Sequence, residues 1–247
     1  MSDDRTLLEG KRILVTGGTT GIGRATVALL AREGARTLTF GRDAAALEDS
    51  LGSLGDSRGE VAGITADVAT RDGVEQVFAE LDRKLGGIDM LVACAALGAE
   101  PIDKMEEEDW RYVIETNLVG YLACARKAIK RMEKSGGGHL LFVGSISTEI
   151  KAEGESVYAA TKAGIQAFAE TLRKEIVGRN IKVSVIQPGS VDTDMQEGSA
   201  QDKRAAVERH EMLHADEVAQ AIVFVLTRSE RADVVNLRIE PRIQKTH

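Results

Sequence analysis

A tyrosine and a lysine four residues apart, Tyr158 and Lys162, carry the clearest chemical signal in the chain. Apolar residues recur at helical spacing in this segment, so we expect a helix that presents both side chains on one face. An ammonium group beside a phenol favours the phenolate and lowers the phenol pKa from about 10 toward the range of general acid–base catalysis. Ser145 lies upstream as a further hydroxyl. The pair therefore predicts a tyrosine that gives and takes protons.

A glycine-rich segment, Thr16–Gly23, lies between an apolar run and a helical pattern near the start of the chain. Gly17, Gly21 and Gly23 allow the backbone to turn tightly and to approach a pyrophosphate at a helix N-terminus. A glycine-rich turn without a ligand is the alternative, but the strand–turn–helix context favours a dinucleotide. Together with the tyrosine–lysine pair, this loop indicates hydride chemistry on a nicotinamide cofactor.

The residues that follow the second apolar run help to choose the cofactor. A chain that binds NAD usually has an acidic residue there, whereas this chain has Arg42, which can bind a 2′-phosphate. Asp43 is either a displaced ribose ligand or a helix N-cap. We therefore expect NADP, with NAD as the less favoured alternative. Asp67 is placed to meet the adenine amino group, and its alternative is a turn residue.

The elements that must position these side chains alternate between runs of strand length and helical patterns. The predicted strands are Arg12–Thr16, Arg36–Phe40, Val61–Thr65, Met90–Ala93, His139–Val143, Lys182–Gln187 and Val234–Ile239. The predicted helices are Ile22–Glu33, Asp43–Leu54, Arg71–Leu85, Glu107–Lys134, Val157–Val177 and Asp216–Leu226. We therefore predict an α/β fold: a single-domain, doubly wound, Rossmann-like parallel sheet over residues 1–247, with helices on both faces and ligands at the carboxyl ends of the strands.

Composition narrows the function classes. The chain has 247 residues, of which 43% are hydrophobic, a formal net charge of −7 and a pI of about 5.3. Its Lys and Arg residues are dispersed, so we expect neither nucleic acid nor a membrane surface as a partner. No apolar run approaches the ~20 residues of a membrane span, and the polar start Met1–Glu9 lacks the apolar core of a signal peptide. These features predict a cytoplasmic protein.

The two cysteines, Cys94 and Cys124, match neither a disulfide framework nor a CxxC metal site. Free cysteine is among the most buried residue types. We therefore expect two buried, reduced thiols.

The chain resembles the short-chain dehydrogenase/reductase family over almost its whole length. The resemblance implies that Asn117, Ser145, Tyr158 and Lys162 form a catalytic tetrad. Tyr158 would donate a proton to a carbonyl oxygen, Ser145 would hydrogen-bond the same oxygen, and Lys162 would lower the Tyr158 pKa and hold the nicotinamide ribose. Asn117 would anchor a water that connects Lys162 to solvent. The implied activity is NAD(P)-dependent interconversion of a small carbonyl compound and its alcohol.

The resemblance also implies a cofactor site. The turn Pro188–Thr193 of this chain looks like the Pro-Gly-x-Val-x-Thr turn of the family. In the family, the valine and threonine of that turn contact the nicotinamide amide. The implied residues are Gly17, Thr19, Thr20, Gly21, Ile22, Gly23, Arg42, Asp67, Val68, Tyr158, Lys162, Pro188, Gly189, Val191 and Thr193.

One family element is missing, because Ala93–Ala96 stands where the family usually has Asn-Asn-Ala-Gly. The change leaves open how the sheet is braced beside the adenosine. It motivates an alternative function: a cofactor-binding regulatory or scaffold protein with the same fold and no turnover.

Residues His210–His214 match the pattern His-Glu-x-x-His. On a helix, this pattern places two imidazoles on one face for zinc, and zinc hydrolysis through His210 and His214 is a remote alternative. A third ligand cannot be picked out, so we expect no metal. The family resemblance instead implies a variable substrate lid at about 190–214, with a polar helix over roughly Ala200–Leu213.

The substrate is less clearly indicated. The ending Arg231–Pro241 looks like the family branch that acts on serine and other 3-hydroxy acids, or on small carbonyl compounds in general. Lys151 in the pocket wall either pairs with a substrate carboxylate or points to water. Family members commonly assemble through their two long helices, which implies a homodimer or homotetramer.

Overall fold

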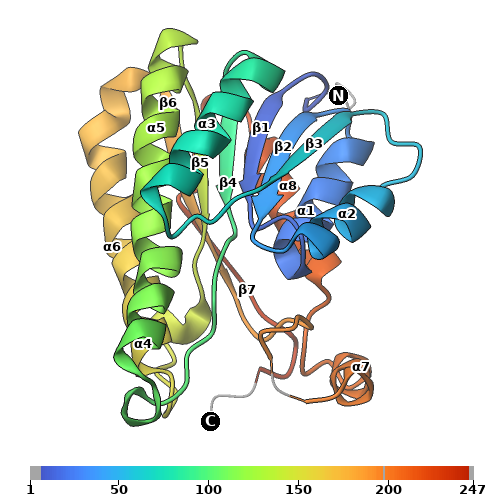
Figure 1. Cartoon of the computed structure of the whole chain (residues 1–247), viewed down its shortest axis with the longest axis vertical. Helices are drawn as coiled ribbons and strands as arrows, with labels where there is room; N and C mark the ends of the chain where they lie inside the picture. The colour runs from blue at the N-terminus through green and yellow to red at the C-terminus, as the bar shows by residue number, and fades with distance from the viewer. Residues whose placement is uncertain (1–6, 197, 245–247) are drawn as a thin grey trace.

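A parallel β-sheet forms the centre of the computed structural model, which describes residues 7–196 and 198–244 (Figure 1). Its seven strands confirm the predicted fold class, with an order that reverses direction between β1 and β4. Most of the polar start Met1–Glu9, and also His247, lie outside the described ranges. The strands, in order across the sheet, are β3 (Glu60–Thr65), β2 (Arg36–Gly41), β1 (Arg12–Thr16), β4 (Met90–Ala93), β5 (Gly138–Val143), β6 (Ile181–Pro188) and β7 (Asn236–Ile239).

Helices cover both faces of the sheet, which explains why the central strands are continuous apolar runs rather than alternating ones. On one face, α3, α5 and α6 enclose the larger core cluster, and on the other α1 and α8 enclose the second. The helices are α1 (Gly21–Arg32), α2 (Ala44–Gly52), α3 (Arg71–Leu85), α4 (Glu107–Ile114), α5 (Gly120–Lys134), α6 (Ser156–Ile176), α7 (Ala200–Glu208) and α8 (Ala215–Leu226). None of the helices in the described ranges is long and apolar enough to cross a membrane.

The predicted long helix Glu107–Lys134 is interrupted. A π-helical turn, Glu115–Val119, joins α4 to α5 and contains Asn117. The Asn117 side chain binds the backbone of Leu97: its Oδ1 accepts from the Leu97 amide at 2.7 Å, and its Nδ2 donates to the Leu97 carbonyl at 2.8 Å. A π turn within a helix is rare and is often found at functional sites.

The predicted lid helix is too long. The structure ends α7 at Glu208, and His210 adopts a left-handed backbone with φ = 61°. The amide of His210 donates to the carbonyl of Val207, and the amide of Glu211 donates to that of Ala206, each at 2.8 Å. These two bonds form a Schellman motif, which ends a helix by satisfying its last carbonyl groups.

Candidate active site

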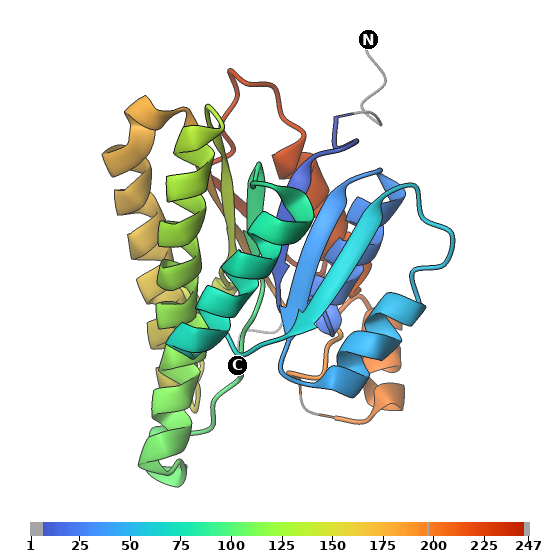
Figure 2. The same ribbon diagram turned by 45° about the horizontal axis from the view of Figure 1, so that its top comes forward.

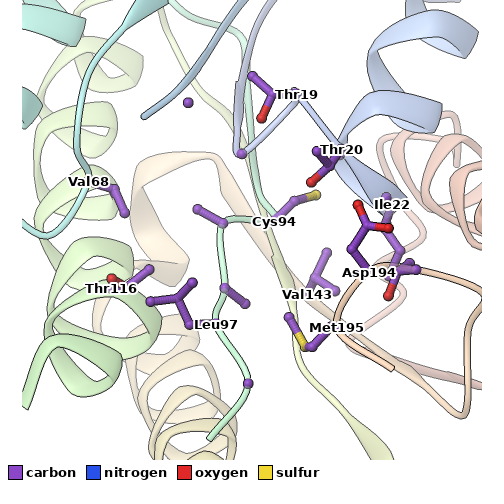
Figure 3. A pocket seen from close by; sticks show the side chains of 18 of the residues that line it. Thr19, Thr20, Ile22, Val68, Cys94, Leu97, Thr116, Val143, Asp194 and Met195 are labelled. Carbon is purple, nitrogen blue, oxygen red and sulfur yellow. The ribbon is translucent and has the colours of Figure 1, made fainter. Parts of the chain in front are cut away.

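A pocket of about 440 Å³ lies at the carboxyl ends of the strands. Figure 3 shows Val68, Thr116 and Leu97 on one side of it and Asp194 and Met195 on the other. Every residue that the sequence analysis assigns to the cofactor lines this pocket: Gly17, Thr19, Thr20, Gly21, Ile22, Gly23, Arg42, Asp67, Val68, Tyr158, Lys162, Pro188, Gly189, Val191 and Thr193. Ser145 also lines it, whereas the buried Asn117 does not.

The glycine loop between β1 and α1 has the geometry of a phosphate cradle. Gly17 and Gly21 have positive φ values of 68° and 50°, which favour glycine. A Cβ on Gly23 would lie 2.1 Å from the carbonyl oxygen of Gly17, so the turn closes only without a side chain there. Thr20 makes no side-chain cap, which leaves the first amides of α1 available for an anion beside the pocket. These residues fit the pyrophosphate of a dinucleotide.

The opposite wall, after β2 and β3, carries a basic and an acidic side chain bridged by a tyrosine. The Arg42 guanidinium donates to the Tyr112 hydroxyl at 2.7 Å, and that hydroxyl donates to Asp67 Oδ2 at 2.6 Å. Asp43 accepts a 3.0 Å hydrogen bond from Ala46 N as the N-cap of α2, which supports the helix-cap interpretation of this residue. Tyr112 has no recognisable signal in the sequence, because its contacts with Arg42 and Asp67 join residues that are 70 and 45 positions apart in the chain.

The other end of the pocket brings together the residues with acid–base chemistry. Tyr158 and Lys162 lie one turn apart on α6, with the lysine Nζ 5.6 Å from the centre of the phenol ring. Ser145, which follows β5, lies close enough to the Tyr158 hydroxyl to lower the pKa of that phenol. Lys162 is buried, and its ammonium group donates to the carbonyl of Val143 at 2.9 Å. A carbonyl group that approaches Tyr158 would thus meet two hydroxyl groups at once.

The segment Ala93–Ala96, which replaces the family's Asn-Asn-Ala-Gly, is held in place by hydrogen bonds with residues of neighbouring elements. The hydroxyl oxygen of Thr16 accepts hydrogen bonds from the amides of Cys94 and Ala95, both at 3.0 Å. Leu97, which follows this segment, is hydrogen-bonded to Asn117 in the π turn. Two neighbouring elements therefore hold the loop without the family's asparagine pair.

The segment after β6 returns onto the glycine loop. A Cβ on Gly21 would lie 3.0 Å from Thr193 Cγ2, and the carbonyl of Thr193 accepts a 2.7 Å hydrogen bond from Lys203 on α7. Val191 forms an isolated parallel bridge with Leu213. The predicted nicotinamide contacts, Val191 and Thr193, are thus fixed at the rim of the pocket.

Comparison with known proteins identifies the family. A family model for short chain dehydrogenases matches residues 11–204. The chain belongs to this family. The 3-oxoacyl-[acyl-carrier-protein] reductase FabG of Escherichia coli (strain K12) is 33% identical over 225 residues, which cover 88% of this chain and 90% of the relative.

Solved structures agree with this assignment. L-sorbose reductase from Gluconobacter frateurii, complexed with NADPH and L-sorbose, superposes with a TM-score of 0.87 at 26% identity, covering 99% of this chain and 100% of that one. A short chain dehydrogenase from Burkholderia cenocepacia J2315 in complex with NADP superposes with a TM-score of 0.84 at 27% identity, covering 95% and 98%.

Two polar residues beside the tyrosine of this short-chain dehydrogenase were missed from the sequence. Ser147 Oγ lies 2.9 Å from Ser145 Oγ and donates to the Glu155 carboxylate at 3.3 Å. Either serine hydroxyl can be the donor in the Ser145–Ser147 contact, so the Ser145 proton stays available to a group at Tyr158. Nothing in the spacing of these residues distinguishes them from an ordinary serine-rich turn and a helix-entry glutamate.

The pKa shifts in this site differ from expectation. Removal from water raises the pKa of Tyr158 to about 12, opposed by the nearby side chain of Ser145 and reinforced by the charge of Glu155. Burial lowers the pKa of Lys162 to about 8. The predicted lowering of the Tyr158 pKa by Lys162 is therefore not seen in the protein alone, because desolvation of the phenol is the largest contribution and the ammonium is directed at Val143.

Lys162 should destabilise the fold at neutral pH. Its folded pKa of about 8 lies below its ordinary value of 10.5, so the unfolded state binds more protons between these two values. The free energy of unfolding should therefore rise from pH 8 to pH 10.5, and the cost below pH 8 is about 3 kcal/mol. We expect Lys162→Met to raise the melting temperature at pH 7 by several degrees and to flatten this rise. Melting curves of both proteins across pH check this, and a variant that melts lower than the wild type at pH 7 would contradict it.

The structure does not support the zinc alternative. His210 lies beyond the end of α7 and His214 is the N-cap residue of α8, so the two imidazoles do not share a helix face. Glu211 between them pairs with Arg209 at 2.9 Å. Across residues 7–196 and 198–244, no group of three or more His, Cys, Asp or Glu residues could hold a metal ion.

Proposed function

We propose that this protein is an NADP-preferring carbonyl reductase or alcohol dehydrogenase that acts on a small carbonyl compound. The observation that carries the proposal is the shape of one pocket. The glycine loop and Arg42 line one part of it, and Ser145, Tyr158 and Lys162 line another. A nicotinamide dinucleotide bound on the loop would therefore reach the Arg42 guanidinium at one end and the Tyr158 hydroxyl at the other.

The roles follow from the charge that develops during the reaction. The bound nicotinamide supplies or accepts the hydride. As a carbonyl oxygen gains negative charge, Tyr158 transfers its hydroxyl proton to it, and Ser145 stabilises the same oxygen by a hydrogen bond. Lys162 lies beside the phenol and stabilises the phenolate that the transfer leaves. In the opposite direction Tyr158 receives the proton of the alcohol.

The preference for NADP rests on Arg42. Its guanidinium is exposed at the end of β2, where an acidic residue would repel a phosphate. The structural relatives bound to NADPH and NADP support this choice. We expect Arg42→Asp to lower the ratio of NADPH affinity to NADH affinity by about 100-fold, since a charge-assisted contact is replaced by repulsion.

Fluorescence titration with each cofactor measures this ratio. Arg58→Asp is the matched control, because it changes the net charge equally but precedes β3, at the end of the sheet opposite the pocket. An unchanged ratio in Arg42→Asp would show that Arg42 does not read the 2′-phosphate.

The substrate class is tested by oxidation of NADPH and NADH over a panel of β-keto acids, aldehydes, cyclic ketones and diketones, with Tyr158→Phe as control. Relatives named for 3-oxoacyl substrates and for L-sorbose make keto esters and keto sugars useful additions. Turnover of one class that requires Tyr158 supports the proposal. Tight cofactor binding without turnover on any compound would favour the regulatory alternative. The replaced segment Ala93–Ala96 does not itself support that alternative, because its backbone is still hydrogen-bonded to Thr16.

Assembly and location remain predictions. Helices α5 and α6 lie side by side on one flank of the molecule (Figure 2). Val119, beside α5, is 42% exposed, so this flank offers apolar surface to a second copy. We propose a homodimer or homotetramer formed through these helices, a cytoplasmic location and a variable substrate lid at about 190–214.

A further inference from the structure

Tyr112 occupies a position between two opposite charges at the adenosine end of the pocket. It lies on α4, and its hydroxyl accepts from Arg42 Nη1 at 2.7 Å and donates to Asp67 Oδ2 at 2.6 Å. The Arg42 guanidinium carbon is 5.2 Å from the centre of the Tyr112 ring, within the range of a cation–π contact. Arg42 and Asp67 line the pocket itself.

The direction of these hydrogen bonds is fixed by chemistry. A guanidinium only donates and an ionised carboxylate only accepts, so the phenol must donate to Asp67 and accept from Arg42. Burial and the donation to Asp67 raise the pKa of Tyr112, so the hydroxyl keeps its proton. Asp67 is also held from its other oxygen, which accepts from Ala69 N at 2.9 Å. The phenol therefore links the two charged groups and occupies the position in which they would otherwise pair.

The contact between Tyr112 and Arg42 lowers the entropy cost of binding an anion beside Arg42. An exposed arginine loses conformational entropy when a ligand orders it, and a contact already made in the free protein removes part of that cost. The contact with Tyr112 uses one of five N–H groups, and the others remain available to a phosphate.

We propose that Tyr112 is a specificity-determining residue for the cofactor: its hydroxyl holds Arg42 in position for the 2′-phosphate and prevents Arg42 from pairing directly with Asp67. This role rests on the proposed use of NADP. Tyr112 acts through Arg42, so its effect should appear only with ligands that carry the 2′-phosphate and only when Arg42 is present.

A double-mutant cycle tests this role by calorimetry. The dissociation constants of NADPH, NADH, 2′,5′-ADP and 5′-ADP are measured for the wild type, Tyr112→Phe, Arg42→Ala and the double variant. We expect Tyr112→Phe, which keeps the ring, to weaken NADPH and 2′,5′-ADP by about 5- to 10-fold and NADH and 5′-ADP by less than about 2-fold. In the Arg42→Ala background the same change should have no effect on any of the four ligands.

Trp110→Phe, an aromatic change on the same helix, is the matched control and should leave all four constants unchanged. Equal weakening of phosphorylated and unphosphorylated ligands by Tyr112→Phe, no weakening at all, or the same weakening without Arg42 would each overturn the role of Tyr112. These outcomes differ from a wild type that binds NADPH no more tightly than NADH, which would overturn the proposed NADP preference and the role of Tyr112 with it.

Discussion

Tyr158→Phe is expected to lower the rate of carbonyl reduction by about 10³-fold, because it removes the only proton donor that the mechanism uses. Phenylalanine retains the ring that packs beside Lys162, so the pocket should keep its shape. The affinity for NADPH should stay within about twofold of the wild type, since the lost group acts on the substrate oxygen in the transition state. Rates at saturating cofactor, together with a separate NADPH titration, measure the two effects.

The separation of these effects is what makes the variant informative. Ser145 and Lys162 remain in place, so any residual rate reports on the hydrogen bond and charge that they supply. Activity close to that of the wild type would show that another group protonates the product. A parallel loss of NADPH binding would indicate a disturbed pocket rather than lost chemistry.

Gly23→Ala should have the second largest effect. A Cβ at this position would lie 2.1 Å from the carbonyl oxygen of Gly17, so the backbone of the turn must move. The amides at the start of α1 would move with it, and a misplacement near 1 Å in such a site can cost about 100-fold. We expect NADPH affinity to fall by about that factor, with a loss of about 1–3 kcal/mol in the free energy of unfolding from overpacking. Calorimetric titration and chemical denaturation measure these quantities.

Gly52→Ala provides the matched control. Gly52 ends α2, and a Cβ there would meet no atom within 4 Å. Alanine favours a helix over glycine, so this variant should keep its NADPH affinity and lose no stability. Normal NADPH binding by Gly23→Ala would mean that the turn is not the cofactor cradle.

The sequence was sufficient for the elements whose formation depends on local pattern. Strands such as β1 and β5 are buried on both faces and therefore appear as uninterrupted apolar runs. The start of α1 follows from glycines whose positive φ or close backbone contacts exclude other residues. The cofactor residues that the family resemblance implied line one pocket, because the carboxyl ends of parallel strands meet there.

Features that depend on tertiary contacts could not be predicted. The π turn at Glu115–Val119 leaves the apolar periodicity of the long helix almost unchanged, and its position is fixed by the loop that Asn117 contacts. The end of α7 depends on His210, whose carbonyl accepts from Ile243 N at 2.9 Å far along the chain. Neither event has a local sequence signal of the kind that glycine or proline provides.

The pKa shifts and charged contacts of the site could not be predicted from the sequence either. The spacing of Tyr158 and Lys162 placed a cation beside a phenol, but burial of both side chains shifts each pKa toward the uncharged form. The bridge from Arg42 through Tyr112 to Asp67 joins three elements that are distant in sequence. Such effects require the distances that only the folded chain defines.

The most direct test of the central claim is transfer of deuterium, from NADPH that carries deuterium at both hydrogen positions of nicotinamide C4, to a carbonyl substrate identified in the panel. Hydride transfer in this pocket predicts an alcohol with one deuterium on the former carbonyl carbon, detected by mass spectrometry, and no labelled product with Tyr158→Phe on the same time scale. An alcohol without deuterium on that carbon, or equal labelling by the variant, would contradict the proposed reaction.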